Sequence, residues 1–544
     1  MQSNFDQESS GFSTPDNISR VRQLIRPRFA HDIHDYALYG ICKAMDGFHV
    51  VSVVKTGGGK TTYFAGFMAL LQELDKLPDS HDLKRCLNRR IPRNAVTIIV
   101  FPTKELEEDM ETAFNKLGIP SIAINEDTLK AARTRRIDLW ALAVQPHLRC
   151  ILLSPEQLSS KPFTTALSNP IFYSRIIALD IDEIHLILSW GAPGFRVSFR
   201  DIGNALMRLP RWTTLTGVTA TLPGGTDTQK MTQILGLKEG SFSFTRRSNH
   251  RPELQFIFRT LRHGLQGWIF PDFDWILAGC RKTIIYCRTI SLAFRLRRKR
   301  FRLYCSLYPN LYNKSSRDMF VSDPDCQVMI STDALKVGND FPNVDDVVVV
   351  DPEDPADIVQ KGGRAGRKPP FSNPGPRCVC YFTQSTVKRA NTVLANRTED
   401  SDPNPETVSM AHLILAKCIT KQLDIIFDNP MDDTPCSCET SAPSLVRPGR
   451  GIVMAERLNP QMREYGQSTR IQWLPPLALL TDVSIGNILD EFSRLKTIAD
   501  ISPYVNGFLR GHEQALLDEI HNMRKKFNRI KIGLDPEHQY VLNT

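Results

Sequence analysis

The chain has 544 residues, of which 41% are hydrophobic and 23% charged, and this composition predicts about two to four globular domains with ordinary buried cores. No apolar run reaches the roughly 18 residues of a membrane helix, and neither the polar N-terminus nor the 12 scattered cysteines suggest a secreted disulfide framework. The formal net charge of +9 favours polyanionic partners.

The first 20 residues are polar, and we expect residues 1–20 to form a disordered tail. After them, short runs rich in Val and Ile alternate with longer helical patterns. This alternation is typical of parallel sheets that are covered by helices on both faces. Two series of runs are predicted to be strands: Val50–Val54, Thr97–Phe101, Cys150–Ser154, Ile176–Asp180 and Leu215–Thr219, then Leu254–Phe258, Thr283–Cys287, Gln327–Ser331, Val347–Asp351 and Cys378–Phe382.

Two series of strands predict two tandem α/β domains, with a seam near Arg246–Pro252. The pattern changes at "TEDSDPNPET", which is typical of a loop, and helical spacing dominates afterwards. We expect a mainly helical C-terminal region. The predicted parts after the tail are a first α/β domain, a second α/β domain, a helical hairpin and a helical accessory module, at residues 21–247, 248–393, 394–448 and 449–544.

A glycine-rich stretch, "VVSVVKTGGGKTT", follows the first predicted strand and precedes a helical pattern. This context is the one that a phosphate-binding loop requires. The N–H groups of Gly57, Gly58 and Gly59 could surround phosphate oxygens at a helix N-terminus, with Lys60 reaching the β- and γ-phosphates. The hydroxyl of Thr61 is suited to Mg²⁺. The alternative is a glycine-rich turn that merely contains a lysine.

Two acids, Asp182 and Glu183, end the predicted strand in "IIALDIDEIHLILSWG". Ligands bind at the carboxyl ends of strands in parallel sheets. Asp182 could hold Mg²⁺ directly or through water, and Glu183 could orient and polarise an attacking water. The alternative is a pair of surface acids at the end of a strand.

Two further motifs follow strands. "TGVTATL" places Thr219 and Thr221 after a strand, and "IVQKGGRAGRKPP" contains Gln360, Arg364 and Arg367. Paired arginines in a glycine-rich turn suit stabilisation of the charge on a transferred phosphoryl group. Taken alone, these arginines could equally belong to a solvated basic loop.

These motifs together resemble those of a superfamily-two helicase of the RecQ type, in order over roughly residues 25–385. The most specific is "DEIHLILSWG", because RecQ proteins continue the DExH box into an aromatic-rich loop with Trp-Gly at this spacing. The other matching stretches are "KTGGGKT", "IIVFPTKELEEDM", "ILLSPEQL", "APGFRVSFRDIG", "NHRPELQF", "KTIIYCRTI", "STDALKVGNDFPNV" and "QKGGRAGR".

The resemblance implies two RecA-like P-loop domains with ATP and Mg²⁺ bound between them. The first domain would contribute nucleotide contacts from Thr56 and the glycine loop, and the second would contribute Gly338 and Asp340. It also implies that an aromatic loop couples DNA to hydrolysis through base stacking, worth about 1–3 kcal/mol per base. The coupling residues would be Trp190, Phe195, Arg196, Thr219 and Thr221, and the alternative for Trp190 is a plain core tryptophan.

Some positions depart from the family. Ala37 stands where RecQ proteins carry a glutamine that reads adenine, which puts the preference for ATP in doubt. "CSLYPNLYN" replaces the usual His-Ala-Gly-Leu stretch, and Lys336 and Asn339 stand at more apolar positions.

RecQ proteins often follow the second domain with a four-cysteine zinc site. This chain supplies Cys418, Cys436 and Cys438, with Ser441 where a fourth cysteine would stand. Structural zinc sites are nearly always four-coordinate, so the fourth ligand could be Asp432, Asp433 or His412. The alternative is a site that has decayed and keeps its helical hairpin without metal.

Basic runs at Arg133–Arg136 and Arg295–Arg302 could contact phosphates, or form solvated helix faces. The second run could also be a nuclear localisation signal. The resemblance implies an ATP-dependent 3′ to 5′ DNA helicase that acts on single-stranded and forked DNA in repair or recombination in the nucleus. The alternatives are a DNA-stimulated translocase without strand separation, an RNA helicase, and a scaffold that uses ATP as a switch.

Overall fold

The computed structural model describes residues 11–87, 89, 91–189, 197–199, 201–279, 281–297, 301–308, 310–335, 341, 343–367, 375–396, 405–430, 497 and 518. The chain divides into two compact units. The larger unit carries most of both β-sheets and the helices that follow them, and the smaller unit includes residues 263–275 and 289–297.

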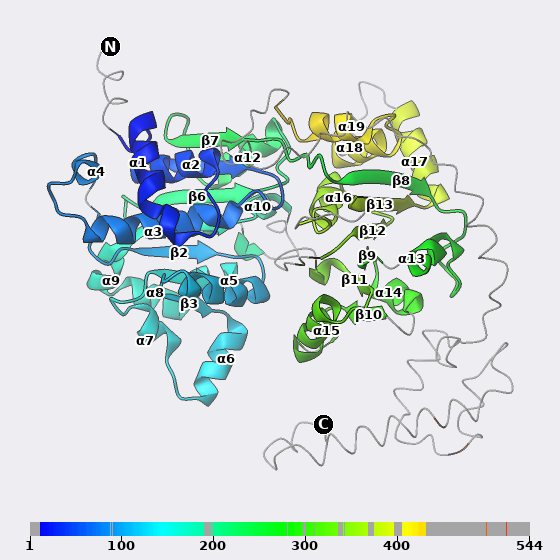
Figure 1. The fold of residues 1–544 in the computed structure, drawn as a ribbon, viewed down its shortest axis with the longest axis horizontal. Helices are drawn as coiled ribbons and strands as arrows, with labels where there is room; N and C mark the ends of the chain where they lie inside the picture. The colour runs from blue at the N-terminus through cyan, green and yellow to red at the C-terminus, as the bar shows by residue number, and fades with distance from the viewer. Residues whose placement is uncertain are drawn as a thin grey trace. The chain divides into compact units, whose positions relative to one another are not determined.

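The first sheet has seven parallel strands in the order β3-β4-β2-β5-β6-β1-β7. Figure 1 labels β2, β3, β6 and β7 among them. Strand β1 is first in the chain but lies inside the sheet, because Val50 pairs with Thr216 on one side and with Ser243 on the other. The strands are β1 His49–Val53, β2 Val96–Val100, β3 Ser121–Ile124, β4 Cys150–Leu153, β5 Ile176–Asp182, β6 Thr214–Thr219 and β7 Phe242–Arg246.

Both faces of this sheet are covered, because its central strands are apolar on both sides and every residue of β2 is buried. Helices α1, α2, α3 and α5 contribute to one core cluster, and α7, α8, α9, α11 and α12 contribute to another. The helices are α1 Pro15–Ile25, η2 Arg26–Arg28, α2 Asp35–Met45, α3 Lys60–Lys76, α4 Asp82–Arg85, α5 Lys104–Lys116, α6 Glu126–Thr134, α7 Leu139–Ala143, η3 Pro155–Ser159, α8 Lys161–Leu167, α9 Pro170–Arg175, α10 Leu186–Ser189, η4 Val197–Phe199, α11 Ile202–Arg208 and α12 Thr226–Ile234.

The second sheet has six parallel strands in the order β10-β11-β9-β12-β13-β8. Its strands are β8 Gln255–Thr260, β9 Thr283–Tyr286, β10 Phe301–Tyr304, β11 Val328–Ser331, β12 Asp346–Val350 and β13 Arg377–Phe382. Its helices are η5 Pro271–Phe273, α13 Asp274–Ala278, α14 Ile290–Leu296, α15 Asn310–Ser322, η6 Asp333–Leu335, α16 Pro355–Gly362, α17 Gln384–Ala395, α18 Pro405–Ile414 and α19 Ile419–Ile426.

The predicted α/β architecture is confirmed, and all ten predicted strands are present within two residues of their expected ends. The sequence did not predict β3, β7 and β10. The chain passes from the first sheet to the second between Arg246 and Gln255.

The prediction of a disordered tail over residues 1–20 is wrong from Gly11 onward. Thr14 caps α1 by accepting a hydrogen bond from the backbone N–H of Asn17. Phe12 is fully buried, and Asp46 accepts hydrogen bonds from the backbone N–H groups of Phe12 and Ser13. The prediction rested on the polar composition of the segment. It overlooked Thr14 and Pro15, which favour the start of a helix, and Phe12, which is buried.

The helices α18 and α19 form the predicted C-terminal hairpin. They pack into the core of the second sheet through Met410, Leu413, Leu423 and Phe427, each at most 5% exposed. The predicted accessory module over residues 449–544 lies outside the described residues, apart from Thr497 and Asp518. In the described part of the chain, no helix has the length and apolar character needed to cross a bilayer.

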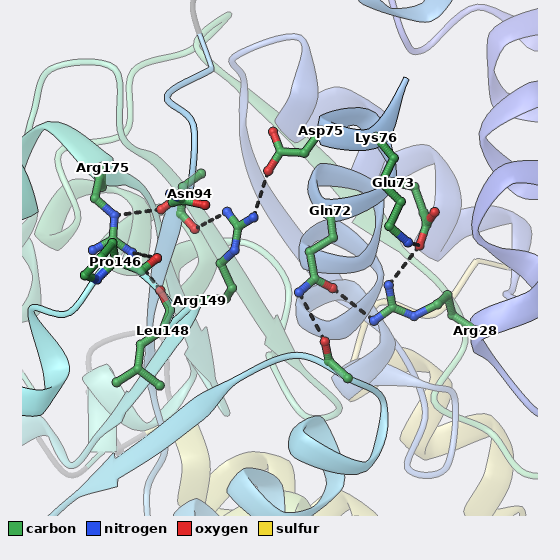
Figure 2. Close-up of polar contacts among 12 residues, drawn as sticks. Arg28, Gln72, Glu73, Asp75, Lys76, Asn94, Pro146, Leu148, Arg149 and Arg175 are labelled. Atoms are coloured by element: carbon green, nitrogen blue, oxygen red, sulfur yellow. Dashed lines mark hydrogen bonds and ion pairs between the residues drawn. The ribbon is translucent and has the colours of Figure 1, made fainter. Parts of the chain in front are cut away.

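Ion pairs hold helix α3 in place near its C-terminal end, as Figure 2 shows. Arg28 donates to Glu73 Oε1 at 3.0 Å and to Gln72 Oε1 at 2.9 Å. Arg149 pairs with Asp75 at 2.7 Å. These contacts fix the helix whose other end carries the glycine-rich loop.

Candidate nucleotide-binding site

The glycine-rich loop connects the end of β1 to the first residue of α3. Gly57 and Gly59 have φ angles of +78° and +71°, in the left-handed region that favours glycine. A Cβ atom on Gly58 would lie 3.0 Å from the carbonyl oxygen of Lys55, so a side chain there would crowd the loop. The three glycines therefore form a tight turn at a helix N-terminus, where backbone N–H groups favour anions.

A tyrosine supports this loop from α2. The Tyr36 hydroxyl donates to the carbonyl oxygen of Gly58 at 2.7 Å. The adjacent Ala37, which stands at the position of the family's glutamine, is fully buried. Ala37 therefore offers no side-chain group that could read a nucleotide base.

The lysine of the loop contacts the acid at the end of β5. Lys60 Nζ lies 3.2 Å from Glu183 Oε1. The Lys60 side chain is 13% exposed and that of Glu183 is 12% exposed. Glu183 has a φ angle of +50°, which is uncommon for a residue with a side chain. This turn directs the carboxylate back toward the loop, so the structure brings together two residues that the sequence proposed as partners.

A buried network continues from Glu183 through the motif after β6. Thr219 Oγ1 donates to Glu183 Oε2 at 3.3 Å. His185 Nδ1 lies 2.7 Å from Thr219 Oγ1, and the backbone N–H of Thr221 donates to the same oxygen at 3.2 Å. Thr219 and Thr221 thus connect the acid to its neighbours, and His185 is a member of the site that the sequence interpretation did not select.

Strand β5 places two carboxyl groups in different electrostatic environments. Burial raises the pKa of Asp182 to about 7, and the adjacent Glu183 carboxylate adds to that shift. Burial also opposes ionisation of Glu183, but the Lys60 ammonium and the His185 ring outweigh it and lower the pKa of Glu183. Pairs of acids whose pKa values are pushed apart are typical of sites that divide roles between them.

Helix α16 of the second sheet connects to this network. Gln360 Nε2 lies 3.0 Å from His185 Nε2 and donates to Thr221 Oγ1 at 2.8 Å. Gln360 is 4% exposed. The predicted site residue Gln360 therefore contacts residues that follow strands of the first sheet. The sequence did not predict its contact with His185, because the two residues are 175 positions apart.

The two predicted arginines lie in the turn after α16. Arg364 is buried at 7% exposure, and Arg367 Nε donates to the carbonyl oxygen of Gly363 at 3.3 Å. A Cβ atom on Gly363 would lie 2.2 Å from Thr56 Oγ1, so this turn approaches the glycine-rich loop directly. The arrangement brings two guanidinium-bearing residues to the side of the candidate phosphate site.

Arg251 was not predicted, yet it holds this turn. Its guanidinium donates to the carbonyl oxygens of Gly363 at 3.0 Å, Ala365 at 2.8 Å, and Gly366. It also pairs with Glu253 at 2.7 Å. In the sequence, Arg251 was noted only as part of "NHRPELQF", which resembles the start of the second RecQ domain. That resemblance did not indicate which residues Arg251 contacts.

The side chains of Thr61 and Asp182 fit a bound Mg²⁺. Hydroxyl and carboxylate oxygens are the hard ligands that Mg²⁺ prefers. Burial and the adjacent Glu183 carboxylate raise the pKa of Asp182 despite the nearby Lys60 ammonium. A divalent cation bound at this carboxylate would favour its ionised form.

Several predicted residues cannot be placed. Trp190, Phe195, Arg196, Gly338 and Asp340 lie outside the described residues, as do Cys436 and Cys438. Cys418 is half-buried and immediately precedes α19. Within the described ranges, no three His, Cys, Asp or Glu side chains cluster as a metal site would require.

Comparisons with known proteins agree with this geometry. The model of the DEAD/DEAH box helicase family matches residues 36–229, and that of the helicase conserved C-terminal domain matches residues 275–369. The chain is 24% identical over 356 residues to ATP-dependent DNA helicase Q1 of Rattus norvegicus, covering 63% of this chain and 55% of the relative. It is 26% identical over 254 residues to ATP-dependent DNA helicase RecQ of Synechocystis sp., covering 45% of each.

The chain spans about half the length of these curated relatives. Among solved structures, that of Mss116p bound to ssRNA and AMP-PNP has a TM-score of 0.52 at 16% identity, covering 77% of this chain and 90% of the other. The helicase MrfA bound to DNA and AMPPNP has a TM-score of 0.51 at 17% identity, covering 74% and 56%. At these identities the structures establish the shared fold.

Two parallel-sheet domains bring a glycine-rich loop, a DExH box and an arginine turn together, and each domain matches a helicase domain model. Among these helicases, the chain is similar to the RecQ type, at 23–26% identity over 254 to 356 residues.

Proposed function

We propose that this chain is an ATP-dependent DNA helicase that couples ATP hydrolysis to movement along single-stranded DNA and to duplex unwinding. The observation that carries the proposal is the buried chain of contacts from Lys60 through Glu183 and His185 to Gln360. It joins the phosphate loop of one sheet to a helix of the other. Nucleotide chemistry at one end is therefore mechanically connected to the second domain.

The resting contact of Lys60 suggests how nucleotide would start the cycle. Its ammonium lies 3.2 Å from Glu183 Oε1, and incoming phosphates would compete for the same ammonium. Glu183 would then be free to accept a hydrogen bond from water and orient it for in-line attack. Thr61 and Asp182 would hold Mg²⁺, which supplies charge neutralisation at the phosphates when bound.

Arg364 and Arg367 would act on the transferred phosphoryl group. Their positive charges favour the charge distribution of the transition state, an effect worth about 10³–10⁵ in turnover for arginine fingers. Gln360 would couple a movement of His185 to a movement of α16, because its amide contacts both His185 and Thr221. Each of these residues is present, which argues against a scaffold that binds ATP without turning it over.

DNA as substrate is supported by the relatives, which are named as DNA helicases. Movement from 3′ to 5′, preference for forked substrates, action in repair or recombination, and a nuclear location extend this proposal and rest on the family resemblance alone. The zinc site stays a prediction from the cysteine spacing.

The test measures ATPase activity and strand separation side by side. Substrates are single-stranded DNA, DNA duplexes with a 3′ or a 5′ tail, forks, and RNA duplexes. We expect ATPase stimulated by single-stranded DNA and unwinding of 3′-tailed duplexes, with Glu183→Gln as the inactive control. ATPase without unwinding would instead favour a translocase, unwinding confined to RNA would favour an RNA helicase, and absence of turnover would overturn the proposal.

A further inference from the structure

Residues 246–251, which we call the linker, begin at the last residue of β7, lead toward β8 and contact the candidate site at several points. Arg246 donates to the carbonyl oxygens of Leu222 and Phe427, both at 2.7 Å. The guanidinium of Arg247 lies 5.0 Å from the ring centroid of Tyr36, the residue that supports the glycine-rich loop. The linker is therefore in contact with both the motif after β6 and the end of α19.

Asn249 is the centre of this linker. It is 5% exposed, and its Nδ2 donates to the carbonyl oxygen of Ala220 at 3.3 Å. Its backbone N–H donates to Asn429 Oδ1 at 3.2 Å, and its Oδ1 accepts from Asn429 Nδ2 at 2.8 Å. This reciprocal pair fixes the linker to the residues that follow α19.

Asp424 orients the second asparagine of the pair. Asn429 Nδ2 donates to Asp424 Oδ1 at 2.8 Å, in addition to its bond with Asn249. The backbone N–H of Asn429 donates to the carbonyl oxygen of Asp424 at 2.9 Å. The amide of Asn429 is thus held in one orientation by α19 itself.

The other end of the linker reaches the arginine turn, residues 363–367. Arg251 follows Asn249 by two residues and donates to three backbone carbonyl oxygens of this turn. Gly366 has a φ angle of +60°, which glycine adopts readily, and the Arg251 guanidinium fixes the position of this turn through its backbone carbonyl oxygens. A displacement of the linker would therefore displace Arg364 and Arg367.

We propose that the helical hairpin α18–α19 sets the catalytic geometry of the arginine turn, with Asn249, Asn429 and Arg251 as positioning residues. Asn429 fixes Asn249, the linker transmits that position to Arg251, and Arg251 holds the turn. The inference rests on the proposed ATPase function for its kinetic consequence, but its structural consequence can be measured without activity. It assigns a role in catalysis to helices that lie outside the glycine-rich loop, the DExH box and the arginine turn.

Asn429→Ala in the full chain tests the proposal, with Asn391→Ala as the matched control. Asn391 is an exposed asparagine whose side chain bonds only within α17 among the contacts of the described residues, to Val387 at 2.9 Å. Hydrogen exchange of the backbone amides of residues 363–367 should become about 5-fold faster in Asn429→Ala, the factor expected for one lost hydrogen bond. It should not change in Asn391→Ala.

The kinetic readout separates positioning from general destabilisation. Asn429→Ala should lower kcat for DNA-stimulated ATPase by about 10-fold or more, because small displacements of catalytic groups are costly, while KM for ATP stays within about 2-fold. Equal kcat in both alanine variants together with unchanged exchange of the turn would overturn the proposal. Faster exchange of the turn in a chain whose wild-type form lacks ATPase would support the structural linkage and refute the proposed function instead.

Substitutions that change the charge at positions 424 and 429 provide a second test in case Asn429→Ala fails to fold. Asn429→Asp should be worse than the alanine variant, because it loses the donor and places a carboxylate against Asp424. Asp424→Asn alone should be nearly silent, since its amide oxygen still accepts from Asn429. Adding Asp424→Asn to Asn429→Asp should recover only part of kcat, because an asparagine at 424 can donate to the new carboxylate while Asn249 Oδ1 still lacks its donor. A double variant no better than Asn429→Asp alone would count against the proposed linkage.

Discussion

Asp182→Asn should stabilise the nucleotide-free protein by an amount that depends on pH. Burial and the neighbouring Glu183 raise the pKa of Asp182 from 3.8 to about 7. When folding raises the pKa of an acid, the acid lowers the free energy of unfolding at every pH above its unfolded pKa, and has no effect below it. Stability is then lost progressively as pH rises from the unfolded pKa of 3.8 to the folded pKa of about 7, and the loss levels off above it.

The size of the effect follows from the shift. About three pKa units correspond to roughly 4 kcal/mol of unfolding free energy. Above about pH 7 the asparagine variant should recover up to about 4 kcal/mol, because it never ionises. At pH 5, only about one unit above the ordinary aspartate pKa, the gain should shrink to less than about 2 kcal/mol.

Thermal melting of wild type and Asp182→Asn between pH 5 and pH 8, without divalent cations, checks this reasoning. Asp318→Asn is the control, because that carboxylate is 62% exposed. The melting temperature of Asp182→Asn should rise above that of wild type increasingly with pH. Mg²⁺ and nucleotide should stabilise wild type more than the variant. A gain that is independent of pH, or a loss of stability, would refute the electrostatic account.

Five further substitutions test the site. Lys60→Ala should abolish nucleotide-dependent activity in a folded chain, and normal turnover would remove the phosphate-loop assignment. Glu183→Gln should bind ATP but hydrolyse it at least about 100-fold more slowly, and near-normal hydrolysis would place the base elsewhere. Replacing Arg364 or Arg367 by alanine should lower kcat more than nucleotide affinity, measured by single-turnover kinetics and equilibrium binding; the reverse pattern would assign them to ground-state binding. Trp190→Ala should abolish stimulation by single-stranded DNA while basal ATPase and the melting temperature persist; a fall of about 3–5 kcal/mol in stability would indicate a core residue instead.

Much of the fold was predictable because the buried strands are continuous apolar runs. Val96–Val100 and Asp346–Val350 are buried at every position, and such runs stand out from their helical surroundings. The three missed strands lie at sheet edges or carry polar residues. Phe242–Arg246 is half-exposed, and Phe301–Tyr304 includes residues of a basic run that was interpreted as a charged surface.

The candidate site was predictable where one motif carries one role. The glycine loop, Lys60 and Glu183 were found because their chemistry is local to short stretches of sequence. The contact of Gln360 with His185 was not, because it joins residues of different sheets. Arg251 was missed for a related reason: its three acceptors are backbone carbonyls, which leave no mark on the sequence.

The interior position of β1 has a consequence for synthesis of the chain. This strand emerges from the ribosome early, yet its two neighbours, β6 and β7, come from much later segments. Sheets that depend on such distant partners form slowly. The nascent chain must therefore carry β1 without its full set of paired strands until the ribosome has released Arg246. An apolar strand with unpaired edges is prone to associate with other chains in that interval.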